Sequence, residues 1–165
     1  MKTGMGRGLC DKIAAVNFSK ITDDLFIGTT PLTEDYKRLR DLGVRLVINM
    51  RWDYRLRPDP HAEPLSLLWL PTVDNPFFPI PIWALRRGAL AALETIQAGG
   101  KVYVHCASGR HRGVAMGAAV LIAQGYGPRE AMELIKANRS VADPDIFYIR
   151  GRILRFAQQW EMAPH

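Results

Sequence analysis

A run of β-branched and aliphatic residues, Val44–Met50 (VRLVINM), most strongly constrains the fold of this chain. Continuous apolar runs of this kind are typical of strands buried on both faces of a central, mainly parallel sheet. Shorter runs at Leu25–Gly28, Leu65–Leu70 and Lys101–His105 predict further strands. A sheet buried on both faces needs helices to cover it, so these runs indicate an α/β protein.

Helical segments alternate with these strands and then complete the chain. We predict five helices, over Glu34–Leu42, Ile82–Ala98, Gly113–Gln124, Pro128–Asn138 and Asp145–Met162. Thr33 is expected to cap the first of them, because a hydroxyl at that position accepts from free backbone N–H groups. The order of elements predicts an α/β fold with a mainly parallel central sheet flanked by helices.

The composition fits one domain. The chain has 165 residues, of which 48% are hydrophobic and 23% charged. A domain of this size buries roughly 70% of its unfolded surface and folds without disulfides or structural metal. No internal repeat or low-complexity linker divides the sequence. We therefore expect residues 1–20 to form a loosely ordered basic segment and residues 21–162 to form a single domain.

The two cysteines, Cys10 and Cys106, cannot form a disulfide framework, and no Cys/His cluster has the spacing of a zinc site. Free thiols indicate a reducing compartment, so we expect a cytoplasmic location. The basic stretch Met1–Lys12 lacks an apolar signal core, and the apolar stretch Val114–Ala123 is too short to span a bilayer. These features argue against a secreted or integral membrane protein.

The net charge of +6 permits nucleic acid, an acidic membrane surface or a phosphorylated molecule as partner. Of the 22 basic residues, 16 are arginine, which suits two-point contact with phosphate oxygens. The arginines are dispersed along the chain, and a solvated basic surface explains most of them. No nucleic-acid-binding motif accompanies them, so we expect no nucleic acid partner.

The segment from His105 to Gly113 (HCASGRHRG) lies between a predicted strand and a predicted helix, where α/β proteins bind ligands. Backbone N–H groups from Ala107 to Arg112 can surround one anion, and Gly109 permits the necessary backbone conformation. The helix dipole and the Arg112 guanidinium favour negative charge at the same point. These effects favour the thiolate of Cys106, a nucleophile suited to attack on phosphorus.

The plainer interpretation of Cys106 is a buried structural cysteine at the end of a core strand. A chance match of His, Cys, Gly and Arg at four set positions is rare in a chain of this length. The pattern therefore favours a catalytic cysteine.

His105–Arg112 matches the His-Cys-x5-Arg signature of the cysteine-dependent protein tyrosine phosphatases. The flanking stretches ITDDLFIGTTPLTEDYKRLRDLGVRLVINM and NRSVADPDIFYIRGRILRF resemble their dual-specificity branch, so the resemblance covers about Ile21–Phe156. It implies that residues 21–162 are a phosphatase-like catalytic domain. It also implies hydrolysis of phosphate monoesters through a phosphocysteine intermediate, with no metal or other cofactor.

The resemblance also implies roles for the residues of the signature. Cys106 is the expected nucleophile, and Arg112 is expected to hold the phosphoryl oxygens. His105 is expected to orient the loop through hydrogen bonds without touching the substrate. The expected substrate-binding backbone is that of Ala107, Ser108, Gly109, Arg110 and His111.

A general acid must protonate the leaving oxygen in such a reaction. Asp74 follows the strand Leu65–Leu70 and lies 32 positions before Cys106, a spacing similar to that of the family's acid. Asp53 and Asp59 compete for the role, although Asp59 lies between prolines and resembles a turn residue. Asp74 itself also fits a turn before Asn75–Pro76. We predict that Asp74 is the acid.

One position departs from the family. Ser or Thr usually follows the signature arginine and stabilises the thiolate when the phosphocysteine breaks down, whereas this chain has Gly113. Ser108 is not expected to replace it, because side chains of such a loop point away from the anion. We therefore expect a slow second step.

The loop side chains bear on the substrate. Arg110 and His111 resemble those of members that act on inositol phosphates or anionic phospholipids, and Arg51, Arg55 and Arg57 would extend the positive field. Alternatively, Arg110 pairs with a carboxylate and His111 packs against the fold. A phosphotyrosine, phosphoserine or phosphothreonine protein therefore stays as compatible as a phosphoinositide or inositol phosphate. Peripheral contact with anionic lipid also stays open.

Two other functions remain open. A non-catalytic phosphate-binding module would share the fold, and a rhodanese-type sulfurtransferase would share a cysteine followed by a loop of amides.

Cys10 is interpreted as an exposed thiol. We interpret four tryptophans as core or loop anchors, although two of them adjoin the candidate site loops: Trp52, Trp69, Trp83 and Trp160, with Trp52 and Trp83 beside the site.

Overall fold

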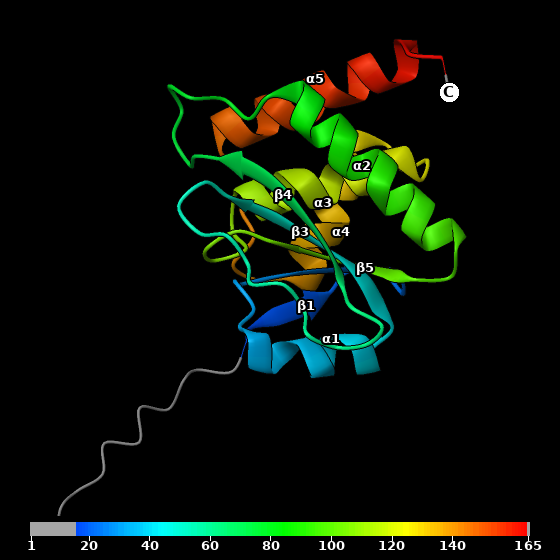
Figure 1. Cartoon of the computed structure of the whole chain (residues 1–165). Helices are drawn as coiled ribbons and strands as arrows, with labels where there is room; N and C mark the ends of the chain where they lie inside the picture. The colour runs from blue at the N-terminus through cyan, green and yellow to red at the C-terminus, as the bar shows by residue number, and fades with distance from the viewer. Residues whose placement is uncertain (1–15, 165) are drawn as a thin grey trace, which may run out of the picture.

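The computed structural model describes residues 16–164, and these residues contain one five-stranded sheet in the order β1-β2-β5-β3-β4 (Figure 1). Its strands are β1 (Phe18–Lys20), β2 (Leu25–Gly28), β3 (Val44–Arg51), β4 (Ser66–Thr72) and β5 (Lys101–His105). Strand β1 pairs antiparallel with β2, and every other neighbouring pair is parallel. The predicted fold class is confirmed.

Helices cover both faces of this sheet. They are α1 (Tyr36–Asp41), α2 (Ile82–Gln97), α3 (Arg112–Ala123), α4 (Pro128–Asn138) and α5 (Phe147–Met162). Figure 1 shows α2 to α5 on one face and α1 on the other. Each face has its own cluster of buried side chains, so the central strands are apolar on both sides, as the Val44–Met50 run requires.

Helix α3 is buried along its length from Arg112 to Ile122. Gly117 allows its close approach to β2, because a Cβ at this position would lie 2.4 Å from Cδ1 of Ile27. Gly88 of α2 likewise leaves room for the Met116 sulfur of α3. Close packing leaves a buried helix little freedom to shift. The N-terminus of α3, which follows the signature loop, therefore has a fixed position.

The predicted start of the first helix is wrong. Thr33–Asp35 forms a 3-10 turn, and α1 begins only at Tyr36. The Leu32 N–H donates to the carboxylate of Asp35 over 2.8 Å, and Thr33 makes no capping hydrogen bond. A charged acceptor three residues ahead stabilises this tight turn in place of a hydroxyl cap.

Other boundaries shift by one or two residues. Strand β4 continues through Pro71 to Thr72, because β4 is an edge strand and the register against β3 shifts beside this proline. Helix α3 begins at Arg112, one residue before the predicted start, and α5 begins at Phe147, two residues after it. The predicted bounds of α4 and β5 are confirmed.

Strand β1 lies within the segment predicted to be loosely ordered, residues 1–20. It forms the edge of the sheet through its pairing with β2. Cys10 lies outside the described residues.

Residues 16–164 contain neither a candidate membrane span nor a candidate metal site. No helix there combines the length and the apolar character needed to cross a membrane. In the same part of the chain, no three His, Cys, Asp or Glu residues group so that they would hold a metal ion.

Candidate active site

Cys106 follows β5 at the carboxyl edge of the parallel strands and is almost fully buried. Its Sγ accepts a hydrogen bond from the Gly109 N–H over 3.3 Å, so the loop curls back over the sulfur. Helix α3 begins six residues later at Arg112 and directs its N-terminus toward the same loop. Backbone N–H groups and a helix N-terminus both stabilise negative charge, so this position is suited to a bound anion.

Gly109 has a φ of +64°, a conformation that other residues adopt only with strain. A Cβ here would also lie 2.7 Å from the carbonyl oxygen of Gly28 at the end of β2. Both the backbone angle and the close approach therefore require glycine at the turn of the loop.

Arg139, directly after α4, supports the loop from outside and is almost fully buried. Its guanidinium donates to the carbonyl oxygens of Gly109 over 2.8 Å and Ser108 over 2.9 Å. Its remaining hydrogen bonds go to Asn17 and Ser19, so it also ties the loop to the first strand. The carbonyls of the loop are thus directed toward Arg139, which leaves the N–H groups for the anion side.

Arg139 was not predicted as a site residue from the sequence. It lies in the quoted stretch NRSVADP, which resembles the family, but nothing in that stretch distinguishes a buried arginine from an exposed one. An arginine next to serine after an amphipathic helix is usually a solvated residue.

Arg112 is the first residue of α3 and is also buried. Its Nη1 donates to the carbonyl oxygens of Thr72 over 2.8 Å and Met50 over 3.4 Å, at the ends of β4 and β3. Its Nε has no hydrogen-bond partner within residues 16–164. A buried guanidinium with a free N–H group is prepared to bind an oxyanion.

His105 is fully buried, and this burial lowers its pKa to about 4, so its imidazole is neutral at physiological pH. Its Nδ1 lies 3.2 Å from the Cys106 carbonyl oxygen, which also accepts from the Thr30 hydroxyl over 3.0 Å. Two donors therefore fix the peptide group that follows Cys106.

Asp74 lies on the loop after β4 and meets two side chains from other elements. Its carboxylate accepts from the Tyr148 hydroxyl of α5 over 2.7 Å and lies 2.8 Å from Nδ1 of His111 in the signature loop. The structure therefore brings Asp74 to the loop that contains Cys106, from 32 positions away in the sequence. The contact with Tyr148 was not foreseen, because a tyrosine in the first turn of a helix has many possible uses.

Burial acts to raise the pKa of Asp74, but the hydrogen bonds from Tyr148 and His111 outweigh it and lower this pKa below its usual value. Asp53 forms a two-point ion pair with Arg51, which lowers the pKa of Asp53 to about 2. Asp59 accepts from Arg40 and from the Leu65 N–H. Of the three candidate acids, Asp74 is therefore the one that contacts the signature loop.

The extra basic side chains of the loop both have acidic neighbours. Arg110 lies 3.9 Å from Asp143 and stays half-exposed, whereas His111 pairs with Asp74. Arg51 donates to the Thr30 hydroxyl, which in turn donates to Cys106. Arg51 is thereby connected to the loop.

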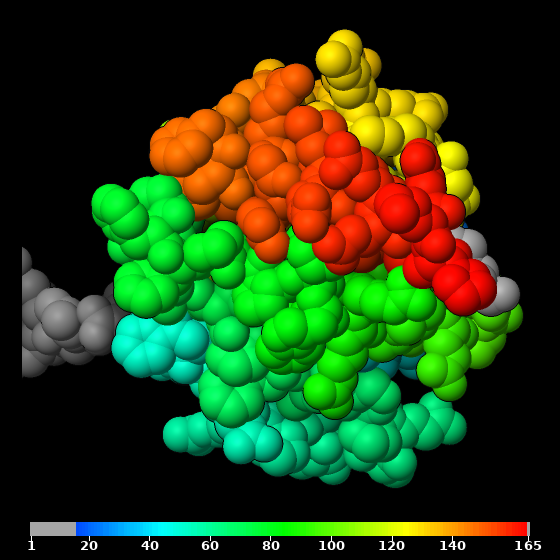
Figure 2. Space-filling model, turned by 90° about the horizontal axis from the view of Figure 1, so that it is seen from above, coloured from blue at the N-terminus to red at the C-terminus, as the bar shows by residue number. Residues whose placement is uncertain are grey.

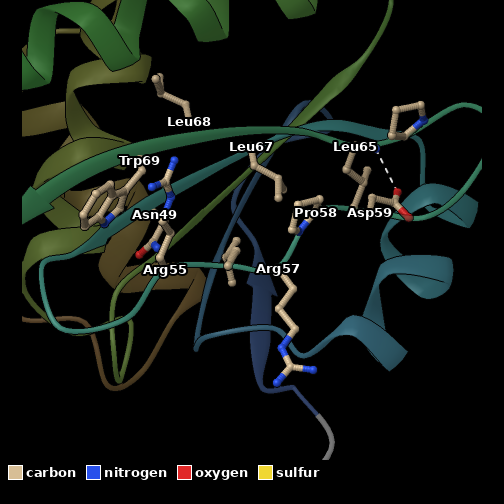
Figure 3. Close-up of a pocket in the computed structure, with 11 residues that line it drawn as sticks. Asn49, Arg55, Arg57, Pro58, Asp59, Leu65, Leu67, Leu68 and Trp69 are labelled. Carbon is tan, nitrogen blue, oxygen red and sulfur yellow. Dashed lines mark hydrogen bonds between the residues drawn. The ribbon is translucent and has the colours of Figure 1, made fainter.

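Arg55 and Arg57 lie elsewhere. They line a pocket of about 690 Å³ between β4 and the loop before it, together with Trp69, and no residue of the signature loop lines this pocket (Figure 3). The Arg55 guanidinium lies 5.1 Å above the ring of Trp69. Of the three arginines expected to extend the positive field, Arg51 alone is linked to the loop by these contacts.

Comparisons with known proteins agree with this architecture. No family model matches the sequence. The chain is 30% identical over 128 residues to dual specificity phosphatase 28 of Homo sapiens, a match that covers 76% of this chain and 70% of that protein. It is 35% identical over 131 residues to phosphatidylglycerophosphatase and protein-tyrosine phosphatase 1 of Rattus norvegicus, with 74% and 67% covered.

A solved structure of PTPMT1 in complex with PI(5)P superposes with a TM-score of 0.77 at 27% identity, and covers 88% of this chain and 97% of that one. The solved PTPMT1 structure shares the fold of this chain, and both curated relatives are named as phosphatases. The chain therefore belongs to the cysteine-dependent protein tyrosine phosphatases, in their dual-specificity branch, and is a phosphatase.

Proposed function

We propose that the protein hydrolyses phosphate monoesters through a phosphocysteine intermediate on Cys106, in the reducing environment of the cytoplasm. The observation that supports this most is the loop around Cys106, where a backbone N–H donates to Sγ while the carbonyls are held away by Arg139. A free, buried cysteine in this setting is suited to act as a thiolate, which needs a reducing compartment.

In the first step, the thiolate of Cys106 attacks phosphorus, and the bond from phosphorus to the leaving oxygen breaks with its electron pair on that oxygen. Arg112 and the loop N–H groups from Ala107 to His111 stabilise the charge on the three other phosphoryl oxygens. Asp74 supplies the proton that the leaving oxygen takes up. The products are the free alcohol or phenol and phosphocysteine.

In the second step, the carboxylate of Asp74 accepts a proton from water as the water oxygen attacks phosphorus. The bond between sulfur and phosphorus breaks, which returns the thiolate and releases inorganic phosphate. Gly113 offers no hydroxyl to stabilise that thiolate. The backbone at Gly113 has room for a Cβ, which would lie 3.4 Å from the Cys106 nitrogen and 3.5 Å from its Sγ, at ordinary van der Waals distances.

The pH dependence follows from the contacts of Asp74. A carboxyl with a lowered pKa is protonated in only a small fraction of free enzyme molecules near neutral pH. A bound phosphate brings negative charge beside Asp74 and opposes this lowering. We expect kcat/KM to fall as pH rises above the pKa of Asp74, with an optimum on the acid side of neutrality.

The proposed substrates are a phosphorylated protein or a polyanionic phosphate such as a phosphoinositide or inositol phosphate. One relative is named for both a lipid phosphate and protein tyrosine phosphate, and a solved relative holds PI(5)P. Arg110 of the signature loop is half-exposed and can contact a second negative group.

Hydrolysis of para-nitrophenyl phosphate tests this proposal, with the unmodified chain and Cys106→Ser compared. We expect steady release of nitrophenol by the unmodified chain and a fall of at least roughly 10³-fold in the variant. Acid quenching of the unmodified chain during turnover followed by mass spectrometry should find one added phosphoryl group on Cys106. Turnover that survives in Cys106→Ser would contradict the proposal.

A further inference from the structure

Ten large hydrophobic side chains are exposed among the described residues, and six of them are aromatic. Trp69 is the least exposed of the six and lies on β4. The other five lie on loops or first helical turns and are 61–85% exposed: Trp52, Phe77, Phe78, Trp83 and Phe147. This placement was not expected from the sequence, where Trp52 and Trp83 were interpreted as anchors. We call these five residues the aromatic rim.

The aromatic rim follows the candidate active site around the carboxyl edge of the sheet. Phe77 and Phe78 come three and four residues after Asp74, and the ring of Phe147 packs 5.4 Å from that of Tyr148, which donates to Asp74. Trp52 follows Arg51, whose guanidinium donates to the Thr30 hydroxyl beside Cys106. Trp83 lies in the first turn of α2, at the end of the loop that contains Asp74.

The space-filling view shows where these segments meet. In Figure 2 the cyan segment near residue 52, the green segment of residues 77–83 and the orange segment near residue 147 gather at the left edge of the molecule. In Figure 1 the carboxyl ends of the parallel strands point to that same side. A cluster of exposed apolar side chains at one edge of a protein commonly marks an interaction site.

Charge complements this apolar character. Arg110 on the signature loop is 56% exposed. Arg150 on α5 is 41% exposed and pairs with Asp145 over 3.3 Å. The aspartates of these loops each pair with a basic group: Asp53 with Arg51, Asp74 with His111, Asp143 with Arg110 and Asp145 with Lys136. The edge therefore presents no surplus of negative charge, and the whole chain carries +6.

We propose that the aromatic rim docks the protein on an anionic lipid surface, with the signature loop facing the headgroups. This inference rests on the proposed function, because it gives Cys106 access to a phosphate monoester held at a membrane. Tryptophan and phenylalanine side chains insert at the boundary between headgroups and acyl chains, and nearby basic residues attract anionic lipids.

A lipid surface fits the aromatic rim better than a peptide does. Peptide recognition uses a groove or pocket that receives separate side chains. The pocket shown in Figure 3 is lined by none of the five rim residues, and it lies between β4 and the loop that precedes it. The rim instead spreads exposed rings over two loops and two helix starts, an arrangement that suits insertion into a fluid surface.

Flotation with vesicles tests the proposal, using the full chain with phosphatidylcholine alone or with phosphatidylcholine mixed with phosphatidylglycerol. We expect the unmodified chain to bind the anionic vesicles, with weaker binding at high salt. Phe77→Ser with Trp83→Ser should weaken the vesicle partition coefficient roughly a hundredfold, about tenfold for each ring, because each loses part of the apolar area it buries.

The matched control is Leu90→Ser with Met162→Ser. These two residues are exposed apolar side chains on α2 and at the end of α5, outside the rim. We expect this pair to bind vesicles as the unmodified chain does, and hydrolysis of para-nitrophenyl phosphate in free solution reports that each variant is folded.

Three results would overturn the proposal. One is an unmodified chain that does not bind anionic vesicles, and another is an equal loss in the rim and control pairs. The third is unchanged vesicle binding in the rim pair together with a raised KM for a phosphotyrosine protein, which would identify the rim as a protein-docking surface. Normal vesicle binding by a chain that hydrolyses no phosphate monoester would contradict the proposed function and leave the docking surface standing.

Discussion

The two loops that form the candidate site are held in different ways. The signature loop, His105–Arg112, has its functional side chains Cys106 and Arg112 buried and is fixed by backbone contacts, a left-handed glycine and the guanidinium of Arg139. The loop after β4 carries Asp74, a third of whose side chain is exposed, and then two exposed phenylalanines. Two side-chain contacts, from Tyr148 and His111, hold Asp74 at the signature loop.

This difference follows from what each loop must do. A loop that stabilises a transition state by its backbone N–H groups has to be in place before the substrate arrives. A loop that delivers a proton to leaving groups of different size benefits from fewer fixed contacts. The nucleophile side is therefore prearranged by buried groups, while the acid side is positioned by a few replaceable hydrogen bonds.

Arg139→Met removes the buried support of the signature loop, and we expect it to have the largest effect. The variant leaves the Ser108 and Gly109 carbonyls without their buried donor, so we expect a loss of about 3 kcal/mol in the free energy of unfolding. Turnover should fall at temperatures where the variant is still folded. Urea denaturation measures the first effect, with the exposed Arg129→Met as the control. A loss of stability below about 0.5 kcal/mol would mean that Arg139 does not fix the loop.

Gly113→Ser tests the signature loop from the other direction, because it adds a hydroxyl next to Cys106. The new Cβ fits at 3.5 Å from Sγ and its hydroxyl can donate to the thiolate as phosphocysteine breaks down. We expect the steady-state rate to rise about fivefold, because a hydrogen bond to a charged group contributes about 1 kcal/mol or more. Rapid-quench kinetics should show a burst of nitrophenol in the unmodified chain that shrinks in Gly113→Ser. A linear start in the unmodified chain would show that the second step is not slow.

Tyr148→Phe tests the loop after β4, which carries Asp74, and we expect it to have the smallest effect. The variant removes the hydroxyl that donates to Asp74 and leaves the ring in place, so the pKa of Asp74 should rise. The alkaline limb of kcat/KM should then move to higher pH, while kcat at the optimum falls about threefold as the carboxyl becomes less well placed. An unchanged alkaline limb would show that Tyr148 does not act on Asp74.

The same contacts affect stability at low pH. Because the pKa of Asp74 is lowered in the folded state, its hydrogen bonds stabilise the fold fully above the ordinary aspartate pKa of about 4. This contribution disappears as pH falls through the lowered folded value. Thermal unfolding of Tyr148→Phe should therefore differ from that of the unmodified chain near neutral pH and converge with it in strong acid.

Most of the fold was predictable because local signals agreed with the tertiary structure. The apolar run at Val44–Met50 and the glycine- and proline-bounded helices gave their elements within one or two residues. The 3-10 turn at Thr33–Asp35 and the strand Phe18–Lys20 were not predicted. The contact from Asp35 to the Leu32 N–H, three positions away, determines the first, and the prediction placed the cap on Thr33 instead. Pairing with β2 determines the second, and such pairing is not visible in local sequence.

The candidate site was predictable only where its residues are adjacent in sequence or match a known pattern. The signature loop met both conditions, and Asp74 met the second. Arg139 and Tyr148 reach the site by long-range packing of α4 and α5, which local patterns do not encode. Arg55 was grouped with Arg51 by proximity in sequence, but its stacking on Trp69 places it at another pocket.

The central claim is that Cys106 attacks phosphorus from the fixed signature loop while Asp74, on a separate loop, protonates the leaving oxygen. The dependence of the rate on the leaving group tests this claim most directly. The unmodified chain and Asp74→Asn would be compared on aryl phosphates whose phenols range from strongly to weakly acidic. We predict that Asp74→Asn loses about 10²-fold or more with the least acidic phenol and little with the most acidic. An equal loss across the series would contradict proton donation by Asp74.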